Sequence, residues 1–187
     1  RNMLHMFVRD FDDIIAPMEA VDAKVTVNRD DISSLRYNMR TNGRSGFVFV
    51  NHYQRLAKLD DIKAAVIDTG IVKFPPIDVC GDISFFMPFN MTIGENVLEY
   101  ATAQPLCKIG NTYFFTEITG IKAEYKFVNG QVFTPKAGLS SMFEINGVKI
   151  VTLSFEQSKY TRKLSGKLYI GNNCDIYEYN NEICAIQ

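Results

Sequence analysis

The sequence predicts an all-β protein, an antiparallel β-sandwich or jelly roll with one amphipathic helix at its N-terminal end. Three observations carry this prediction. The chain has a series of short apolar segments rich in β-branched and aromatic residues, and turn signals separate them about every 8–12 residues. Helical periodicity is clear only near the N-terminus. The chain of 187 residues is 12% aromatic, which suits sheet faces. We therefore expect a helix and linker over residues 1–30 and a sandwich over residues 31–187.

Residues 3–18 form the predicted helix. Apolar residues recur there at three- and four-residue steps and so share one face: Leu4, Phe7, Val8, Phe11, Ile14, Ile15 and Met18. The charged residues off that face are Arg9, Asp10, Asp12 and Asp13. Pro17 predicts an end near Ala16, because proline disfavours helical geometry in the residue before it. We interpret Asp12 and Asp13 as a solvated helix face rather than an acid/base pair.

The stretch from Ser45 to Leu56 is the centre of the predicted sandwich. Its four apolar residues, Phe47 to Val50, are typical of a strand covered on both faces. A polar cluster follows them. Before this strand, short strands are predicted at 23–27 and 35–39, and residues 58–64 are predicted as a loop or one helical turn.

The remaining strands follow in quick succession. They are predicted at 65–74, 81–89 (ended by Pro88), 91–93, 97–101, 106–109, 112–118, 125–128, 131–133, 142–145, 148–155, 167–170, 176–179 and 183–186. Asn129-Gly130 and Asn146-Gly147 are the best hairpin signals, since both tolerate the positive φ angles of two-residue turns. Gly94-Glu95-Asn96 and Gly110-Asn111 predict two further hairpins.

The composition and motifs exclude several function classes. The net charge of −1 and the absence of a basic run argue against nucleic-acid and membrane-surface partners. The sequence contains no Gly-x-Ser-x-Gly and no phosphate-binding glycine loop. We expect no cofactor and no metal site, because the cysteines lack zinc spacing; reduced, structural thiols are expected at Cys80, Cys107, Cys174 and Cys184. No signal peptide is visible, which favours a cytoplasmic location, although the start at Arg1 leaves open that the chain is cut from a longer protein.

Two kinds of polar residue remain as candidates for chemistry. Glycoside hydrolysis needs two carboxylates across the scissile bond, but the strand glutamates are expected to face solvent: Glu99, Glu117, Glu124 and Glu144. The patch Asn51, His52, Tyr53 and Arg55 is our candidate ligand-binding surface. A histidine among aromatics usually has a structural role, so a ligand role for His52 stays an alternative.

Three stretches together resemble the large β-galactosidases of glycoside hydrolase family 35. Residues Gly46–Arg55 are similar to a Gly-Phe-Leu-Phe-Val/Ile-Asn-Asn-x-x-Arg segment that follows the catalytic barrel in that family. Residues Asp82–Asn90 and Leu98–Leu106 resemble the next β-rich part, and Val151–Ser158 resembles a Val-x-Thr-Leu-x-x-Glu-Gln-Ala stretch. The resemblance spans residues 35–180. It departs from the family at His52, where a second Asn is common, and at the insert 60–65.

The resemblance implies a non-catalytic role for this chain. The family's catalytic glutamates lie in an upstream (β/α)₈ barrel, which 187 mostly β residues cannot contain, and no residue here matches either glutamate motif. We therefore expect no catalytic residue, and a β-sandwich that buttresses the barrel, with loops that shape the rim of its galactoside site. The alternatives are a self-standing carbohydrate-binding module and a small β-fold hydrolase. The face left by a missing barrel would favour self-association.

Overall fold

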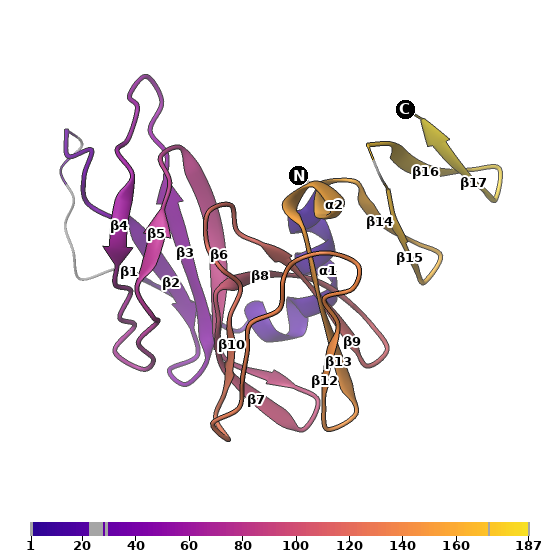
Figure 1. Cartoon of the computed structure of the whole chain (residues 1–187), viewed down its shortest axis with the longest axis horizontal. Helices are drawn as coiled ribbons and strands as arrows, with labels where there is room; N and C mark the ends of the chain where they lie inside the picture. Colours follow the sequence, from indigo (N-terminus) through magenta and orange to yellow (C-terminus); the bar gives the residue numbers. More distant parts are fainter. Residues whose placement is uncertain (1, 23–27, 29, 172, 187) are drawn as a thin grey trace.

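The computed structural model describes residues 2–22, 28, 30–171 and 173–186 (Figure 1). The predicted strand at 23–27 lies outside these residues. The structure is mostly β with an N-terminal helix, α1 (Asn2–Ile15), so the predicted fold class is confirmed.

A seven-stranded antiparallel sheet forms the larger layer. Its strands, in spatial order, are β1 (Glu19–Asp22), β2 (Tyr37–Thr41), β3 (Gly46–His52), β6 (Ile83–Ile93), β7 (Asn96–Ala101), β10 (Tyr125–Phe127) and β11 (Val132–Phe133). Because β1 is the edge strand of this sheet, part of the predicted N-terminal linker belongs to the sandwich itself.

The second sheet has the order β12 (Phe143–Ile145), β13 (Val148–Leu153), β9 (Thr112–Glu117) and β8 (Ala103–Ile109). The four predicted hairpins are confirmed, as β6–β7, β8–β9, β10–β11 and β12–β13. One pairing differs from the antiparallel expectation: β9 and β13 are parallel. The chain between them visits the larger sheet through β10 and β11, and so returns to β9 in the same direction.

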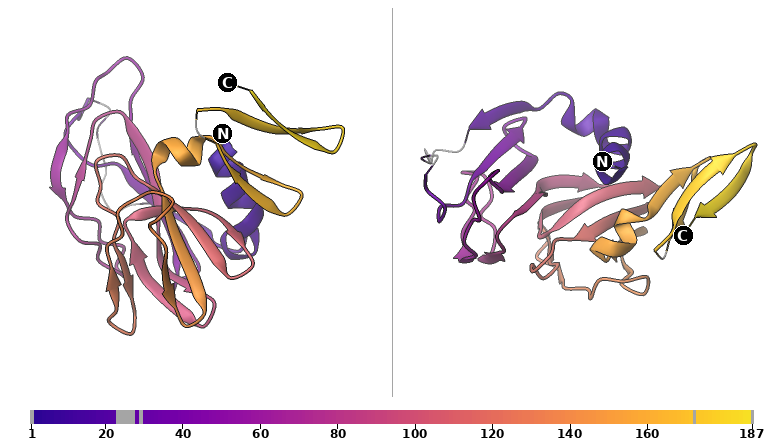
Figure 2. Two further views of the ribbon diagram at one scale, coloured as in Figure 1. Left: turned by 45° about the vertical axis from the view of Figure 1, so that its right-hand side comes forward. Right: turned by 90° about the horizontal axis from the view of Figure 1, so that it is seen from above.

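Three two-stranded sheets complete the fold. One pairs β4 (Ile62–Ala65) with β5 (Ile77–Val79); the others are β14 (Thr161–Leu164) with β15 (Lys167–Ile170), and β16 (Asp175–Tyr179) with β17 (Glu182–Ile186). In the views of Figures 1 and 2 the two C-terminal hairpins extend away from the sandwich, beyond α1 and the second sheet.

The central strand β3 is covered on both faces, as predicted. Phe47 packs against the rings of Phe7 and Phe86 in the core between the two sheets. Its neighbour Val48 faces the opposite way, into a second core beneath the segment that contains β4 and β5. The first residue of the strand is Gly46, and a larger residue does not fit there because an added Cβ would clash with the backbone oxygen of Arg40.

The prediction for β6 was wrong at Pro88, since the strand runs through this residue to Ile93. A proline has no N–H to donate, and inside a sheet this normally ends a strand. Here β6 pairs with β3 up to Phe89 and with β7 from Phe89 onward. Pro88 therefore sits where only one neighbouring strand is present, and its missing N–H costs little.

The predicted helix face needs correction. Phe7 and Phe11 are buried as expected, but Leu4 and Val8 are 49% and 44% exposed, while Met6 and Asp10 are buried. The buried residues Met6, Phe7, Asp10 and Phe11 still recur at three- and four-residue steps, so they form one stripe that is rotated from the predicted face, and Leu4 and Val8 lie beside it. The non-helical dihedral angles of Phe11 (φ −130°, ψ 20°) kink the helix only after these two residues.

Asp10 is buried because it has partners on two other elements. Its carboxylate accepts hydrogen bonds from Lys163 Nζ on β14 (2.7 Å) and from the Lys108 backbone N–H on β8 (2.9 Å). Lys163 also donates to the Lys108 backbone oxygen (3.0 Å). This ion pair joins the N-terminal helix to the first C-terminal hairpin.

Two further strand predictions were wrong. Over 65–74 only Ala65 belongs to a strand, because the Thr69 hydroxyl accepts hydrogen bonds from the N–H groups of Ile71 and Val72 and so makes a turn. The strand predicted over 148–155 ends at Leu153. Ser154 then caps a short helix, α2 (Phe155–Lys159).

Candidate functional site

The predicted binding patch at the end of β3 is split by the structure. Asn51, Tyr53 and Arg55 are exposed, and Tyr53 is 52% exposed. His52 is fully buried, because it continues the inward face of Val48 and Val50. The patch therefore offers three exposed side chains, not four.

His52 holds the segment that follows it. Its Nε2 lies 2.6 Å from the backbone oxygen of Asp60, and its Nδ1 is buried without a hydrogen-bond partner in the described part of the chain. A ring that bonds a backbone carbonyl from inside the core has a structural role, which was the more common role expected for this histidine. Arg36 Nη1 donates to Gln54 Oε1 (2.8 Å) at the same end of the strand.

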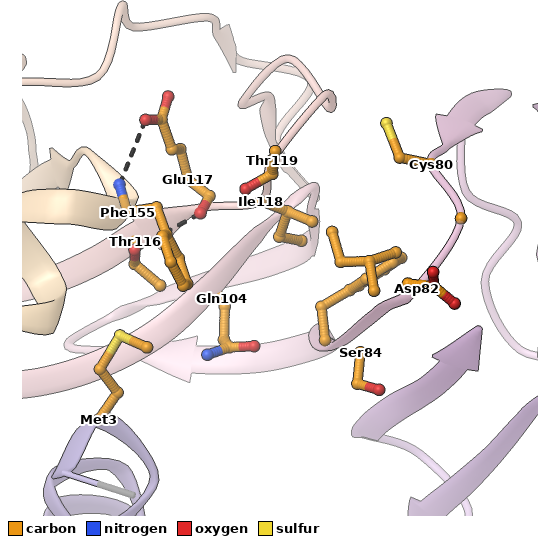
Figure 3. A pocket seen from close by; sticks show the side chains of 13 residues that line it. Met3, Cys80, Asp82, Ser84, Gln104, Thr116, Glu117, Ile118, Thr119 and Phe155 are labelled. Atoms are coloured by element: carbon orange, nitrogen blue, oxygen red, sulfur yellow. Dashed lines mark hydrogen bonds between the residues drawn. The ribbon is translucent and has the colours of Figure 1, made fainter. Parts of the chain in front are cut away.

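A different set of residues encloses a cavity of about 380 Å³ beside this strand end. It lies where the beginnings of β6, α1 and α2 meet the end of β9 and the strand β8 (Figure 3). The lining residues are Met3, Cys80, Gly81, Asp82, Ile83, Ser84, Phe85, Gln104, Thr116, Glu117, Ile118, Thr119 and Phe155. This volume is in the range of small-molecule sites.

Gln104 lies at the centre of the cavity in Figure 3, and the backbone holds it there. Its Oε1 accepts a hydrogen bond from the Phe86 N–H at 3.2 Å, across the gap between the two sheets. Its Nε2 group donates to no other described residue. The amide therefore presents an unused donor at the cavity.

Phe155 is placed by the capping box of α2. The Ser154 side chain accepts from the Gln157 N–H, and the Gln157 side chain accepts from the Ser154 N–H. Glu117 accepts a hydrogen bond from the Phe155 N–H at 3.2 Å. Phe155 is 40% exposed and lines the cavity, and only one oxygen of Glu117 is used by this contact.

The opposite wall is the loop before β6. Asp61 anchors it by accepting the Gly81 N–H (2.8 Å). The turn after β9 comes close to it at Gly120, where an added Cβ would lie 2.8 Å from Cys80 Sγ. Ser84 donates to Asn51 Oδ1 (2.9 Å), which links the cavity wall to the exposed patch on β3.

Two acidic side chains line the cavity, and in Figure 3 Glu117 and Asp82 lie on opposite sides of it. The other strand glutamates are elsewhere: Glu99 pairs with Lys126 (2.9 Å), Glu124 accepts from the Tyr100 hydroxyl (2.7 Å), and Glu144 is exposed. Burial, with the Glu124 carboxylate beside it, raises the pKa of the Tyr100 hydroxyl.

The four cysteines are free thiols, and Cys107 is buried. Burial, reinforced by the nearby Asp10 carboxylate, raises the pKa of its thiol to about 12. This thiol is therefore protonated and a poor nucleophile at neutral pH. Within the described ranges, His, Cys, Asp and Glu side chains form no group of three that could hold a metal ion.

No family profile and no curated protein matches the sequence. No helix among the described residues is long and apolar enough to cross a membrane. The residues that the sequence analysis missed are Gln104 and Phe155. Phe155 could have been found, because Ser154-x-x-Gln157 is a capping-box signature, whereas nothing local marks Gln104.

Proposed function

We propose that this chain is an accessory, non-catalytic β-sandwich domain of a β-galactosidase-like glycoside hydrolase. In this function it buttresses a catalytic barrel, and its loops contribute to the rim of the sugar site. The partner is the barrel, and the chain itself carries no catalytic residue.

The observation that carries the proposal is where the three family-like stretches lie. Residues Gly46–Arg55 include β3. Asp82–Asn90 covers most of β6, and Leu98–Leu106 covers most of β7 and the first half of β8. Val151–Ser158 includes the end of β13 and most of α2. Within these stretches Phe47, Phe86, Leu98, Ala101 and Ala103 lie in the core between the two sheets, and Val151 and Leu153 lie in a separate apolar cluster with Leu106. The resemblance thus falls on residues that build the sandwich, as expected for a domain retained for its structure.

The direct test is reconstitution with a separate barrel. The catalytic barrel of a family 35 β-galactosidase, prepared without the β domain that follows it, would be titrated with this chain. We expect a one-to-one complex by analytical ultracentrifugation and a higher melting temperature of the barrel, because the exposed docking face becomes buried. An unrelated β-sandwich of similar size is the control. Absence of a complex, together with turnover of a chromogenic galactoside by this chain alone, would overturn the proposal.

A self-standing carbohydrate-binding module is the second candidate. The specific observation in its favour is the cavity, which combines an exposed aromatic ring with unused polar groups. Sugar affinity of the isolated chain without any association with a barrel would favour this candidate.

A further inference from the structure

The cavity contains two kinds of unused hydrogen-bonding capacity. Gln104 presents an amide N–H₂ group, which is a donor, and Glu117 presents one carboxylate oxygen, which is an acceptor when ionised. Thr119, an exposed hydroxyl on the same wall, can do both. A ligand that satisfies this set must bring donors and acceptors together.

The charges of the wall exclude anions. Asp82 and Glu117 are acidic, and no described residue that lines the cavity is Lys, Arg or His. A phosphate or carboxylate ligand would therefore enter a negative field with no cationic partner. Neutral ligands and organic cations remain.

The amide of Gln104 separates these two classes. An ammonium group offers only donors, so it could bind Glu117 but would leave the Gln104 donor unpaired. A hydroxyl group donates and accepts, so adjacent hydroxyl groups can serve both side chains. The exposed ring of Phe155 adds an apolar surface on which the C–H face of a saturated ring can lie.

We propose that this cavity is a binding site for one neutral sugar ring, with Phe155 against its C–H face and with Gln104 and Glu117 bonded to its hydroxyl groups. The site is distinct from the exposed patch of Asn51, Tyr53 and Arg55, although Ser84 and Asn51 connect the two walls. The proposed association with a galactosidase supplies only the choice of galactose as the first probe; the ligand class rests on the cavity itself.

The test is isothermal titration calorimetry of the full chain with galactose, glucose and lactose, with methylammonium and inorganic phosphate as ligands of the excluded classes. We expect saturable millimolar binding of at least one sugar, and none of methylammonium or phosphate. Gln104→Met keeps a side chain of similar length but removes the amide donor, and it also leaves the Phe86 N–H without its acceptor. It should weaken sugar binding about tenfold, which is the equivalent of one hydrogen bond.

Phe155→Ala should weaken binding by a similar factor through loss of the stacking surface. Tyr179→Ala is the matched control, because Tyr179 is a 65% exposed aromatic on β16, outside the cavity lining. It should leave the affinity unchanged. Melting curves of each variant establish that the fold is intact.

The proposal is overturned if no sugar binds, if methylammonium or phosphate binds more tightly than every sugar, or if both cavity variants bind sugar as the wild type does. Its failure is separable from that of the proposed function. A chain that binds the barrel but no sugar keeps the accessory function and loses this site. A chain that binds sugar through Gln104 and Phe155 but ignores the barrel keeps the site and loses the accessory function.

Discussion

The end of β3 and the neighbouring cavity both gather polar side chains, but they use them differently. At the end of β3, His52 bonds the Asp60 carbonyl and Gln54 bonds Arg36, so these polar groups hold the protein's own chain. In the cavity, Gln104 and Glu117 each use one polar atom to support the backbone and leave another free. A polar cluster in sequence therefore indicates hydrogen bonding, and only the structure shows whether that bonding is internal.

The largest expected effect concerns the ion pair that holds α1, and with it Met3, beside the cavity. Lys163→Met would leave the buried Asp10 carboxylate without its cation, which typically costs about 3–5 kcal/mol. We expect a drop of this size in the free energy of unfolding, measured by urea denaturation. The control is Lys126→Met, which breaks a partly exposed pair with Glu99 and should cost less than about 1 kcal/mol. Equal effects of the two variants would contradict the structural role of the Asp10 pair.

The next effect concerns His52. His52→Ala removes a buried ring and leaves the Asp60 carbonyl without its partner, so we expect a loss of about 2–4 kcal/mol in unfolding free energy. Sugar affinity should not change if the fold remains intact. A variant that is as stable as the wild type, but binds sugar less well, would place His52 in a binding site and reverse the comparison.

A smaller effect is expected at the cap of α2. Ser154→Ala removes the side chain that accepts the Gln157 N–H, which costs about 1 kcal/mol. Because Phe155 is the first residue of this helix, sugar affinity should fall together with the modest loss in melting temperature. Ser154→Thr restores the cap oxygen and should recover both quantities. A loss of stability with unchanged affinity would remove Phe155 from the site.

The smallest effect is chemical. The pKa of the Cys107 thiol is raised to about 12, so its reactive thiolate is scarce near pH 8 and increases only as the pH approaches that value. Brief treatment with iodoacetamide, followed by mass spectrometry, should modify the half-buried Cys80, Cys174 and Cys184 before Cys107. Bound sugar should slow modification of Cys80, which lines the cavity, and not that of Cys174. Rapid labelling of Cys107 in the folded protein would contradict its burial.

The parts of the fold that were predicted correctly depend on local signals. Asn129-Gly130 and Asn146-Gly147 specify hairpins by themselves, and the apolar run Phe47–Val50 indicates cover on both faces. The errors arose where contacts between residues far apart in the sequence determine burial or strand pairing. Asp10 is buried because Lys163, far along the chain, forms an ion pair with it. Pro88 continues a strand because β6 pairs there with β3 alone, and its pairing with β7 begins only at Phe89.

The cavity could not have been predicted for the same reason. Gln104, Glu117 and Phe155 lie on β8, β9 and α2, and only the packing of these elements brings them together. The sequence did indicate the polar end of β3, but not that His52 is buried. His52 shares a face with Val48 and Val50, and only the structure shows that this face packs beneath the segment that contains β4 and β5.

The most direct measurement is a ¹H–¹⁵N NMR titration of the wild-type chain with galactose, which reports on both regions in one sample. We expect saturable shifts of the Gln104 side-chain amide and the Phe155 backbone amide, with the Tyr53 and Arg55 amides unchanged. Shifts confined to Tyr53 and Arg55, or no saturable shift at all, would contradict this expectation.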